Sequence, residues 1–366
     1  MRLLIFTILL LLAMPESSFA FHKGGVGSCK TCHVMHENQD GLPVPTSGEL
    51  LRGDSPSETC LNCHATTAGA VFANDPLLPG PEYGGGNFVF LLEDELQDGT
   101  RGPDRSVPGE AGGHSIVVPA RGLSMDSRRA VAPGGSFPSM SLACTSCHDP
   151  HGNTDFRMLN GAGPVQGGLA TFSDPAPTAQ GIDLSGPPAS DSNHTAYQGG
   201  WSRWCGNCHG NAWHESGASN FQHPVDIPLG SDVARDYNQY RGDIDPSGGT
   251  IADSYVAMVP FEDPLSTTSS TGGPSASSRL SCISCHRVHA SSAPAAGRWD
   301  FNVQALADDG LASGSWAIPN PWPDPAQRSA CVKCHLVDHD KGKVCLQCHA
   351  PGPGGSAPEL LPTSSP

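Results

Sequence analysis

The chain has 366 residues and a formal net charge of −16, with 20 Lys and Arg residues against 36 Asp and Glu residues. Phosphate binding needs clustered basic residues, so we expect no nucleic-acid partner. Gly and Pro make up about a fifth of the chain and aromatic residues only 6%, so long helices and large sheets are not expected, and a partly disordered chain is the alternative.

Residues 1–20 have the pattern of a secretory signal peptide. Arg2 precedes the apolar run 3–14, and a small-residue cleavage site ends at Ala20. The run is too short to span a bilayer, and no later segment reaches 18 apolar residues. We therefore expect an exported chain that begins near Phe21 and has no membrane span, with a retained N-terminal anchor as the alternative.

All 14 cysteines fall into C-x-x-C pairs, and a histidine directly follows every pair. The cysteines are Cys29 and Cys32, Cys60 and Cys63, Cys144 and Cys147, Cys205 and Cys208, Cys282 and Cys285, Cys331 and Cys334, and Cys345 and Cys348. The histidines that follow them are His33, His64, His148, His209, His286, His335 and His349. Disulfides and zinc ribbons are the alternatives, but neither requires a histidine after every pair.

C-x-x-C-H is the attachment motif of c-type haem. Two thiols at this spacing can each form a thioether bond to a haem vinyl group, which places the adjacent histidine under the iron as the proximal ligand. We therefore predict seven covalently bound haem c groups. Because apolar porphyrin faces can replace a side-chain core, the expected fold class is a multihaem cytochrome c, mostly coil with short helices and little strand, around stacked haems.

Nine histidines lie outside these motifs, close to the number of distal ligands that seven six-coordinate irons need. Methionine is the alternative distal ligand, but we expect histidine on both faces of most haems, and hence low reduction potentials. The distal candidates are His22, His36, His114, His151, His214, His223, His289 and His339, and His194, in a polar stretch, is the expected bystander. Gly113, before His114, would let the backbone approach a flat cofactor.

Three candidates follow a proximal histidine in the pattern C-x-x-C-H-x-x-H. A histidine at that spacing lies on the same side of the local turn as the proximal one, so it cannot easily reach the far face of its own haem. We expect His36, His151 and His289 to bind a neighbouring haem. His339 is expected to serve the last haem in the same manner.

Other regular elements are expected to be few. Short helices are predicted at the haem motifs, a further helix at Asp232–Tyr240, and residues 87–92 are a candidate strand. Connections rich in Gly, Pro and Ser occupy residues 66–140, 150–200 and 262–280.

Several sequence blocks resemble the filament-forming outer-surface multihaem c-type cytochromes. The blocks are residues 21–36, 113–117, 144–152, 204–209, 221–224, 259–262 and 282–289. They run in the family's order from Phe21 to about His335, so the resemblance covers most of the mature chain.

The resemblance implies protomers that stack end to end into an extracellular filament with a continuous haem chain. At each subunit boundary one haem takes its distal histidine from the next protomer, and the matching position is His36, for which spacing alone predicts a role within the chain. We expect a heptahaem domain over residues 21–350, family-like over 21–335. Residues 336–350 are an extension that departs from the family by adding the seventh motif, and a disordered tail, 351–366, follows.

The expected function is electron transfer along closely packed haems, without enzymatic chemistry, in a nanowire exported through the periplasm. Copies of the chain, other cytochromes, metal ions and mineral acceptors are the expected partners. A soluble periplasmic electron shuttle and a multihaem reductase are the alternatives. The reductase needs an iron with an open coordination site, often marked by a variant motif, whereas all seven motifs here end in histidine.

Overall fold

The computed structural model describes residues 29–34, 38–39, 42–43, 50–65, 71–73, 84–92, 96–97, 106–107, 109–182, 187, 189–210, 225–241, 249–257, 259–299 and 333–334. The signal peptide, the seventh haem motif and the C-terminal tail of the sequence-based prediction lie outside these residues.

The helices are short. The α-helices are α2 (Pro56–His64), α3 (Cys144–Cys147), α4 (Trp201–His209), α5 (Gly230–Gln239), α6 (Ile251–Ser254) and α7 (Cys282–Cys285). The 3₁₀-helices are η1 (Cys29–Thr31), η2 (Phe88–Leu92), η3 (Gly109–Gly112), η4 (Pro119–Arg121), η5 (Ser139–Ser141), η6 (Phe156–Met158), η7 (Gln166–Gly168) and η9 (Pro294–Ala296). The helix predicted at Asp232–Tyr240 is confirmed as α5, which buries Ala234 and Tyr237. No helix among the described residues is both long enough and apolar enough to cross a membrane.

Strands of two to four residues form four antiparallel pairs in the described part of the chain. The pairs are β1 (Asn38–Gln39) with β2 (Leu42–Pro43), β3 (Leu96–Gln97) with β4 (Ser106–Val107), β5 (Gly163–Val165) with β6 (Ala170–Phe172), and β7 (Thr178–Gln180) with β8 (Ala196–Gly199). In the β5–β6 pair, Gly163 lies opposite Phe172 and Val165 opposite Ala170. The described structure therefore has the predicted character, mostly coil with short helices and little strand.

The strand predicted for residues 87–92 is wrong, because Phe88–Leu92 forms the 3₁₀-helix η2. The Asn87 side chain explains the difference, since its Oδ1 accepts hydrogen bonds from the amides of Val89 at 3.0 Å and Ala73 at 3.1 Å. A side-chain oxygen that bonds an amide two residues later favours a turn over an extended strand. The apolar run is buried on successive residues, with Phe88 through Phe90 all in the interior.

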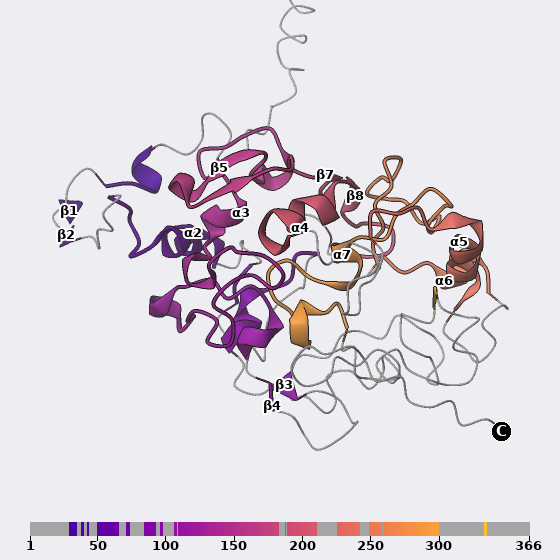
Figure 1. The fold of residues 1–366 in the computed structure, drawn as a ribbon, viewed down its shortest axis with the longest axis horizontal. Helices are drawn as coiled ribbons and strands as arrows, with labels where there is room; N and C mark the ends of the chain where they lie inside the picture. Colours follow the sequence, from indigo (N-terminus) through magenta and orange to yellow (C-terminus); the bar gives the residue numbers. More distant parts are fainter. Residues whose placement is uncertain are drawn as a thin grey trace, which may run out of the picture.

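The helices that carry haem motifs lie in pairs along the long axis of the molecule (Figure 1). Helix α2 packs against α3, and α4 packs against α7. The β1–β2 hairpin lies at one end of this row, and α5 and α6 lie near the other. The motifs are thus arranged in an extended series.

The hydrophobic core is divided into small clusters. The three largest gather around Leu61, Trp204 and Tyr237. Motif cysteines pack at the edges of all three: Cys144, Cys147, Cys205, Cys208, Cys285 and Cys334. The apolar interior therefore borders the positions at which haem would be attached.

Candidate haem sites

Each well-described haem motif contains a helical turn that places its two thiols on one side. In the first, third and fifth motifs, the amide of His33, His148 or His286 donates to the carbonyl of the first cysteine at 2.8, 2.9 and 3.0 Å. The second and fourth motifs form the C-terminal ends of α2 and α4. Because residues three apart are neighbours on a helical turn, both thiols of a motif can reach the same porphyrin.

The third and fifth motifs are followed by the same local structure. His148 Nδ1 donates to the carbonyl of Arg157 at 2.9 Å, and His286 Nδ1 donates to the carbonyl of Ala295 at 2.8 Å. Each acceptor comes nine residues after its histidine and has a positive φ, 51° at Arg157 and 57° at Ala295. The repeated turn fixes both imidazoles in the same way.

With Nδ1 bonded to a carbonyl, Nε2 is the nitrogen through which each proximal ring can bind an iron. His209 follows the same rule, since its Nδ1 donates to the carbonyl of Pro133 at 3.0 Å. Metal-binding histidines generally donate the other ring N–H to such an acceptor, which sets the tautomer and the ring orientation. Burial lowers the pKa of His148 and His286, which favours the neutral imidazole that a metal ion requires.

Imidazole rings from distant parts of the chain face one another in three pairs. The ring centroids of His33 and His151 are 6.4 Å apart, and the planes differ by only 5°. The rings of His148 and His289 are 6.5 Å apart at 55°. The third pair, His114 with His209, has centroids 5.8 Å apart at 47°.

This spacing fits one iron between the two rings of each pair. A metal–imidazole nitrogen bond is about 2 Å long, so two opposed ligands hold their nitrogens about 4 Å apart and their ring centres about 6 Å apart. Aromatic rings in direct contact also have centroids about 4.5–7 Å apart, so the indication of an iron comes from this distance together with the thiol pair of the motif beside each ring pair. The donor set, two imidazoles beside a pair of thiols, is that of a c-type haem with histidine on both faces.

The histidines that lie three residues after a proximal histidine face a different motif from their own. His151 follows His148 but faces His33 of the first motif. His289 follows His286 but faces His148 of the third motif. Burial lowers the pKa of His289 to about 3, so its ring is neutral at physiological pH.

His114 is held by the segment that carries the neighbouring distal candidate. Its Nδ1 donates to the carbonyl of Val288 at 2.7 Å, and its amide donates to the carbonyl of His289 at 2.8 Å. A Cβ at Gly113 would collide with the His289 carbonyl and with Ala290, whereas the approach of this backbone to a cofactor stays a prediction. The glycine thus permits a close approach of two backbone segments.

His194, the expected bystander, is engaged by protein groups at both ring nitrogens. Nδ1 lies 3.1 Å from the carbonyl of Thr195, and Nε2 lies 2.8 Å from both the Ser270 carbonyl and the Tyr255 hydroxyl.

Several predicted site residues lie outside the described part of the chain. They are Cys331, Cys345 and Cys348, the proximal candidates His335 and His349, and the distal candidates His22, His36, His214, His223 and His339.

Two buried serines, which sequence reasoning missed, link the motif-bearing helices. Ser57 Oγ accepts a hydrogen bond from the amide of Cys144 at 3.1 Å, and Ser202 Oγ accepts one from the amide of Cys282 at 3.2 Å. Each serine precedes the first cysteine of its own motif by three residues, a spacing that the second and fourth motifs share. Each link joins two motif-bearing helices that also pack against each other, and we call each such pair of motifs a unit.

In both units, the thiols of the first cysteines of the two motifs are in contact. A thiol–thiol hydrogen bond raises the pKa of Cys60 and lowers that of Cys144. The same contact raises the pKa of Cys205 and lowers that of Cys282. Haems attached to the two motifs of a unit would therefore be neighbours.

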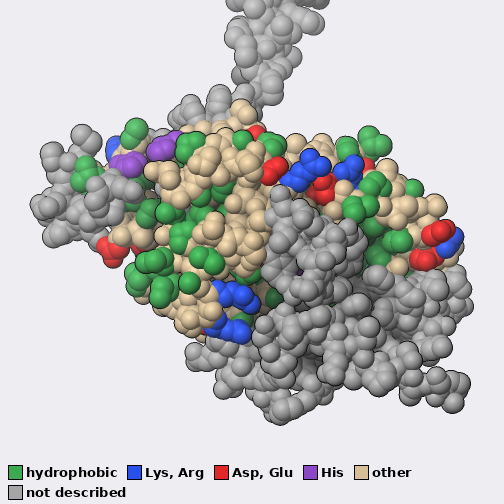
Figure 2. Space-filling model, viewed as in Figure 1, with side chains coloured by type: hydrophobic (Ala, Val, Ile, Leu, Met, Phe, Trp, Pro, Cys, Tyr) green, Lys and Arg blue, Asp and Glu red, His purple; other side chains and the backbone are tan. Residues whose placement is uncertain are grey.

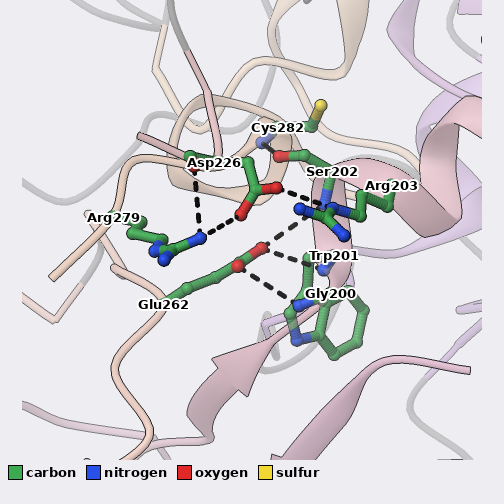
Figure 3. A network of polar contacts seen from close by, with 8 residues as sticks. All are labelled: Gly200, Trp201, Ser202, Arg203, Asp226, Glu262, Arg279 and Cys282. Atoms are coloured by element: carbon green, nitrogen blue, oxygen red, sulfur yellow. Dashed lines mark hydrogen bonds and ion pairs between the residues drawn. The ribbon is translucent and has the colours of Figure 1, made fainter. Parts of the chain in front are cut away.

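A buried carboxylate holds the N-terminus of α4 (Figure 3). Glu262 accepts hydrogen bonds from the amides of Gly200, Trp201 and Ser202 at 3.2, 2.9 and 3.4 Å. Burial raises the pKa of Glu262, and the three amides oppose that effect. A carboxylate at a helix N-terminus satisfies amides that lack helical partners and interacts favourably with the helix dipole.

Beside it, Asp226 joins two arginines. Its carboxylate accepts from Arg203 Nε and from Arg279 Nη1, both at 2.7 Å. The backbone of Glu262 is paired with that of Arg279 in both directions, each bond 2.9 Å long. The network anchors α4, which carries the fourth motif, to the segment that leads into α7.

One end of the row of sites is open to solvent. The His151 side chain is 82% exposed. On the face drawn in Figure 2, histidine side chains come to the surface at the end nearer β1 and β2, and acidic and basic side chains lie side by side along the upper edge and at the opposite end.

No protein-family model matches the chain. The chain is 28% identical to the C-type cytochrome OmcS of Geobacter sulfurreducens over 424 aligned positions, covering 90% of this chain and 96% of OmcS. Two solved structures are similar to it, the outer membrane cytochrome S filament and the OmcS nanowires, both from Geobacter sulfurreducens. Their TM-scores are 0.72 and 0.73, at 25% identity, with 87% of this chain and all of theirs covered. The predicted multihaem cytochrome fold class is confirmed.

Proposed function

Because this chain is an OmcS-like c-type cytochrome in sequence and fold, we propose that it carries electrons along covalently bound haems in an extracellular filament. We assign one haem c to each of the seven C-x-x-C-H motifs, with the motif histidine as the proximal ligand. His151, His289 and His114 are the distal ligands opposite His33, His148 and His209. His22, His36, His214, His223 and His339 are left for the other irons.

The interleaving of histidines between motifs carries this proposal. The segment around His148 and His151 contributes to the sites of His33 and of His148, and His289 contributes the second ring to the site of His148. His114, bonded to the backbone of that same segment, ties in the site of His209. Sites that share segments in this way lie close together.

When bound, haem supplies one-electron redox chemistry at its iron. Burial lowers the pKa of His148 and of His289, which favours the neutral rings that an iron between them would need, and Nδ1 hydrogen bonds fix the proximal rings of His148 and His286. With both faces occupied, an iron has no position for a substrate, and the function is electron transfer rather than enzymatic catalysis.

Assembly into a filament is supported by the similar structures, which are filaments of OmcS. Copies of this chain stack end to end, with His36 offered to a haem of the next protomer. Residues 1–20 direct export through the periplasm, and the filament passes electrons to other cytochromes, metal ions or minerals outside the cell. Nucleic acid is not a partner. Residues 336–350 add the seventh haem to a domain that spans 21–350, and 351–366 form the tail.

The test of this function is electron microscopy of the secreted protein, combined with mass spectrometry of its haem content. We expect filaments whose protomers each carry seven haems. The variant His36→Ala is expected to lose the filaments while keeping nearly all of its haem, because only the junction between protomers changes. Filaments that persist in this variant would place His36 within its own chain.

The same preparations separate the remaining functions. A periplasmic shuttle would appear as single particles with full haem content. A reductase would show a high-spin haem, or carbon monoxide binding in the reduced protein, because one iron would lack its distal ligand.

A further inference from the structure

One lysine inside a haem motif is fully buried. Lys333 lies in the sixth motif, directly before Cys334, and its side chain has 0% exposure. A lysine is almost never fully buried unless its ammonium group has partners. The contacts around Lys333 show what the interior offers to this cation.

The ammonium group lies in a cage built by the C-terminal ends of α5 and α6. Nζ donates to the carbonyl of Tyr240 at 2.8 Å and to the carbonyl of Ser254 at 2.5 Å. It lies 4.0 Å from the centroid of the Tyr237 ring and 5.7 Å from that of Tyr240. Carbonyl oxygens at helix C-termini and aromatic ring faces both favour a positive charge.

The cage is rigid. Tyr237 and Tyr240 are themselves completely buried, and the Tyr237 hydroxyl donates to the carbonyl of Val256 at 3.1 Å, which fixes its ring. Cys334 packs on the cluster that contains both tyrosines. The lysine therefore holds its charge at one position beside a haem-attachment cysteine.

A fixed cation changes the redox balance of a nearby iron. Oxidation adds a positive charge to the iron, so a neighbouring ammonium disfavours the oxidised state, and a poorly solvated surrounding strengthens the effect. Lys333 is bonded to Cys334 and lies two residues before His335, the proximal candidate of the same motif.

We propose that Lys333 is a positioning residue that raises the reduction potential of the haem attached to Cys331 and Cys334, through the charge held between α5 and α6. The proposal rests on the assignment of a haem to the sixth motif. A purely structural role would dock the motif on α5 and α6 and leave the potential independent of charge.

The experiment is a spectroelectrochemical titration of the holoprotein at pH 6, with the Lys333 ammonium held by the two carbonyl oxygens and the tyrosine rings of its cage. Lys333→Met keeps the length of the side chain and its packing on the tyrosines but removes the charge. Lys333→Arg keeps a charge. The matched control is Lys30→Met, because Lys30 also lies inside a haem motif but is exposed.

In Lys333→Met, we expect the part of the absorbance change that one haem contributes to occur at a lower potential than in the parent protein. The titration curves of Lys333→Arg and Lys30→Met should match that of the parent protein. Mass spectrometry of the peptide from Cys331 to His335 shows whether haem is attached. If Lys333→Met loses the haem, Lys333→Gln, which can still donate to a carbonyl, replaces it.

Three results separate the proposals. Superimposable curves for Lys333→Met and the parent protein, with haem still attached, would overturn the role of Lys333 and leave the proposed function intact. An equal downward shift in Lys333→Arg and Lys333→Met would assign the effect to packing and also overturn it. If the peptide from the parent protein carries no haem, the assignment of a haem to the sixth motif is refuted, and the inference about Lys333 is refuted with it.

Discussion

At the scale of single residues, the histidines connect segments that are far apart in the chain. His151 comes from the third motif segment but faces His33 in the first, and their rings are almost parallel. Spacing alone predicted that such a histidine serves a neighbouring site, because it cannot reach round its own haem. Which neighbour it serves depends on the packing of segments, which local spacing does not encode.

We predict that His151→Ala leaves one iron with an open face. The variant should gain a high-spin haem signal and bind carbon monoxide when reduced, because alanine offers no ligand. Optical and electron paramagnetic resonance spectroscopy measure both effects.

His194→Ala is the control, because both ring nitrogens of His194 are engaged by protein groups. It should leave every haem low-spin. A His151→Ala protein that remains wholly low-spin would rule out this histidine as a ligand.

At the scale of elements, each haem-bearing helix needs support from outside itself. Helix α4 has nine residues and begins after Gly200, an N-cap residue that has no side chain to accept a hydrogen bond. Glu262 supplies the missing acceptor from a segment about sixty residues away, beyond the reach of local capping rules. A sequence scan for caps therefore could not find it.

We predict that Glu262→Ala lowers the free energy of unfolding of the holoprotein by about 2–3 kcal/mol, because it leaves buried amides at the start of α4 without their acceptor. Glu262→Gln should cost less, since one oxygen remains. Denaturant unfolding gives the free energy, and hydrogen exchange at Trp201 and Ser202 localises the loss.

Asp232→Ala is the matched control. Asp232 is also an acidic residue in the first turn of a helix, α5, but both Asp232 and its ion-pair partner Arg235 are exposed to solvent. Exposed pairs contribute little, so the variant should unfold almost as the parent does. Equal losses in Glu262→Ala and Asp232→Ala would contradict the special role of Glu262.

At the scale of the whole molecule, small apolar clusters border the thiols and no single large core gathers the described chain. We predict that the chain produced without haem attachment stays largely unfolded, because these clusters alone do not offset the conformational entropy of so many Gly and Pro connections. Circular dichroism and limited proteolysis of apoprotein and holoprotein measure the difference. A protease-resistant apoprotein with the helix content of the holoprotein would contradict this view.

The sequence alone predicts the haem motifs and the scarcity of regular structure, because both depend on local spacing and composition. It also predicts α5, whose buried residues Ala234 and Tyr237 are three positions apart and so lie on one face of a helix. It fails at residues 87–92, where one asparagine side chain turns an apolar run into a 3₁₀-helix. It also cannot pair His114 with His209, because that contact depends on how long irregular connections fold.

The ligand sharing that we propose between segments would impose an order on maturation. If the chain emerges from its N-terminus, the site of His33 stays open until His151 has been exported, and the site of His148 waits in turn for His289. The site of His209 is different, because His114 precedes it and is already present. Newly secreted chains would thus pass through stages in which some irons lack their distal ligand. A chain truncated after His209 would keep the His148 site incomplete, because it would never supply His289.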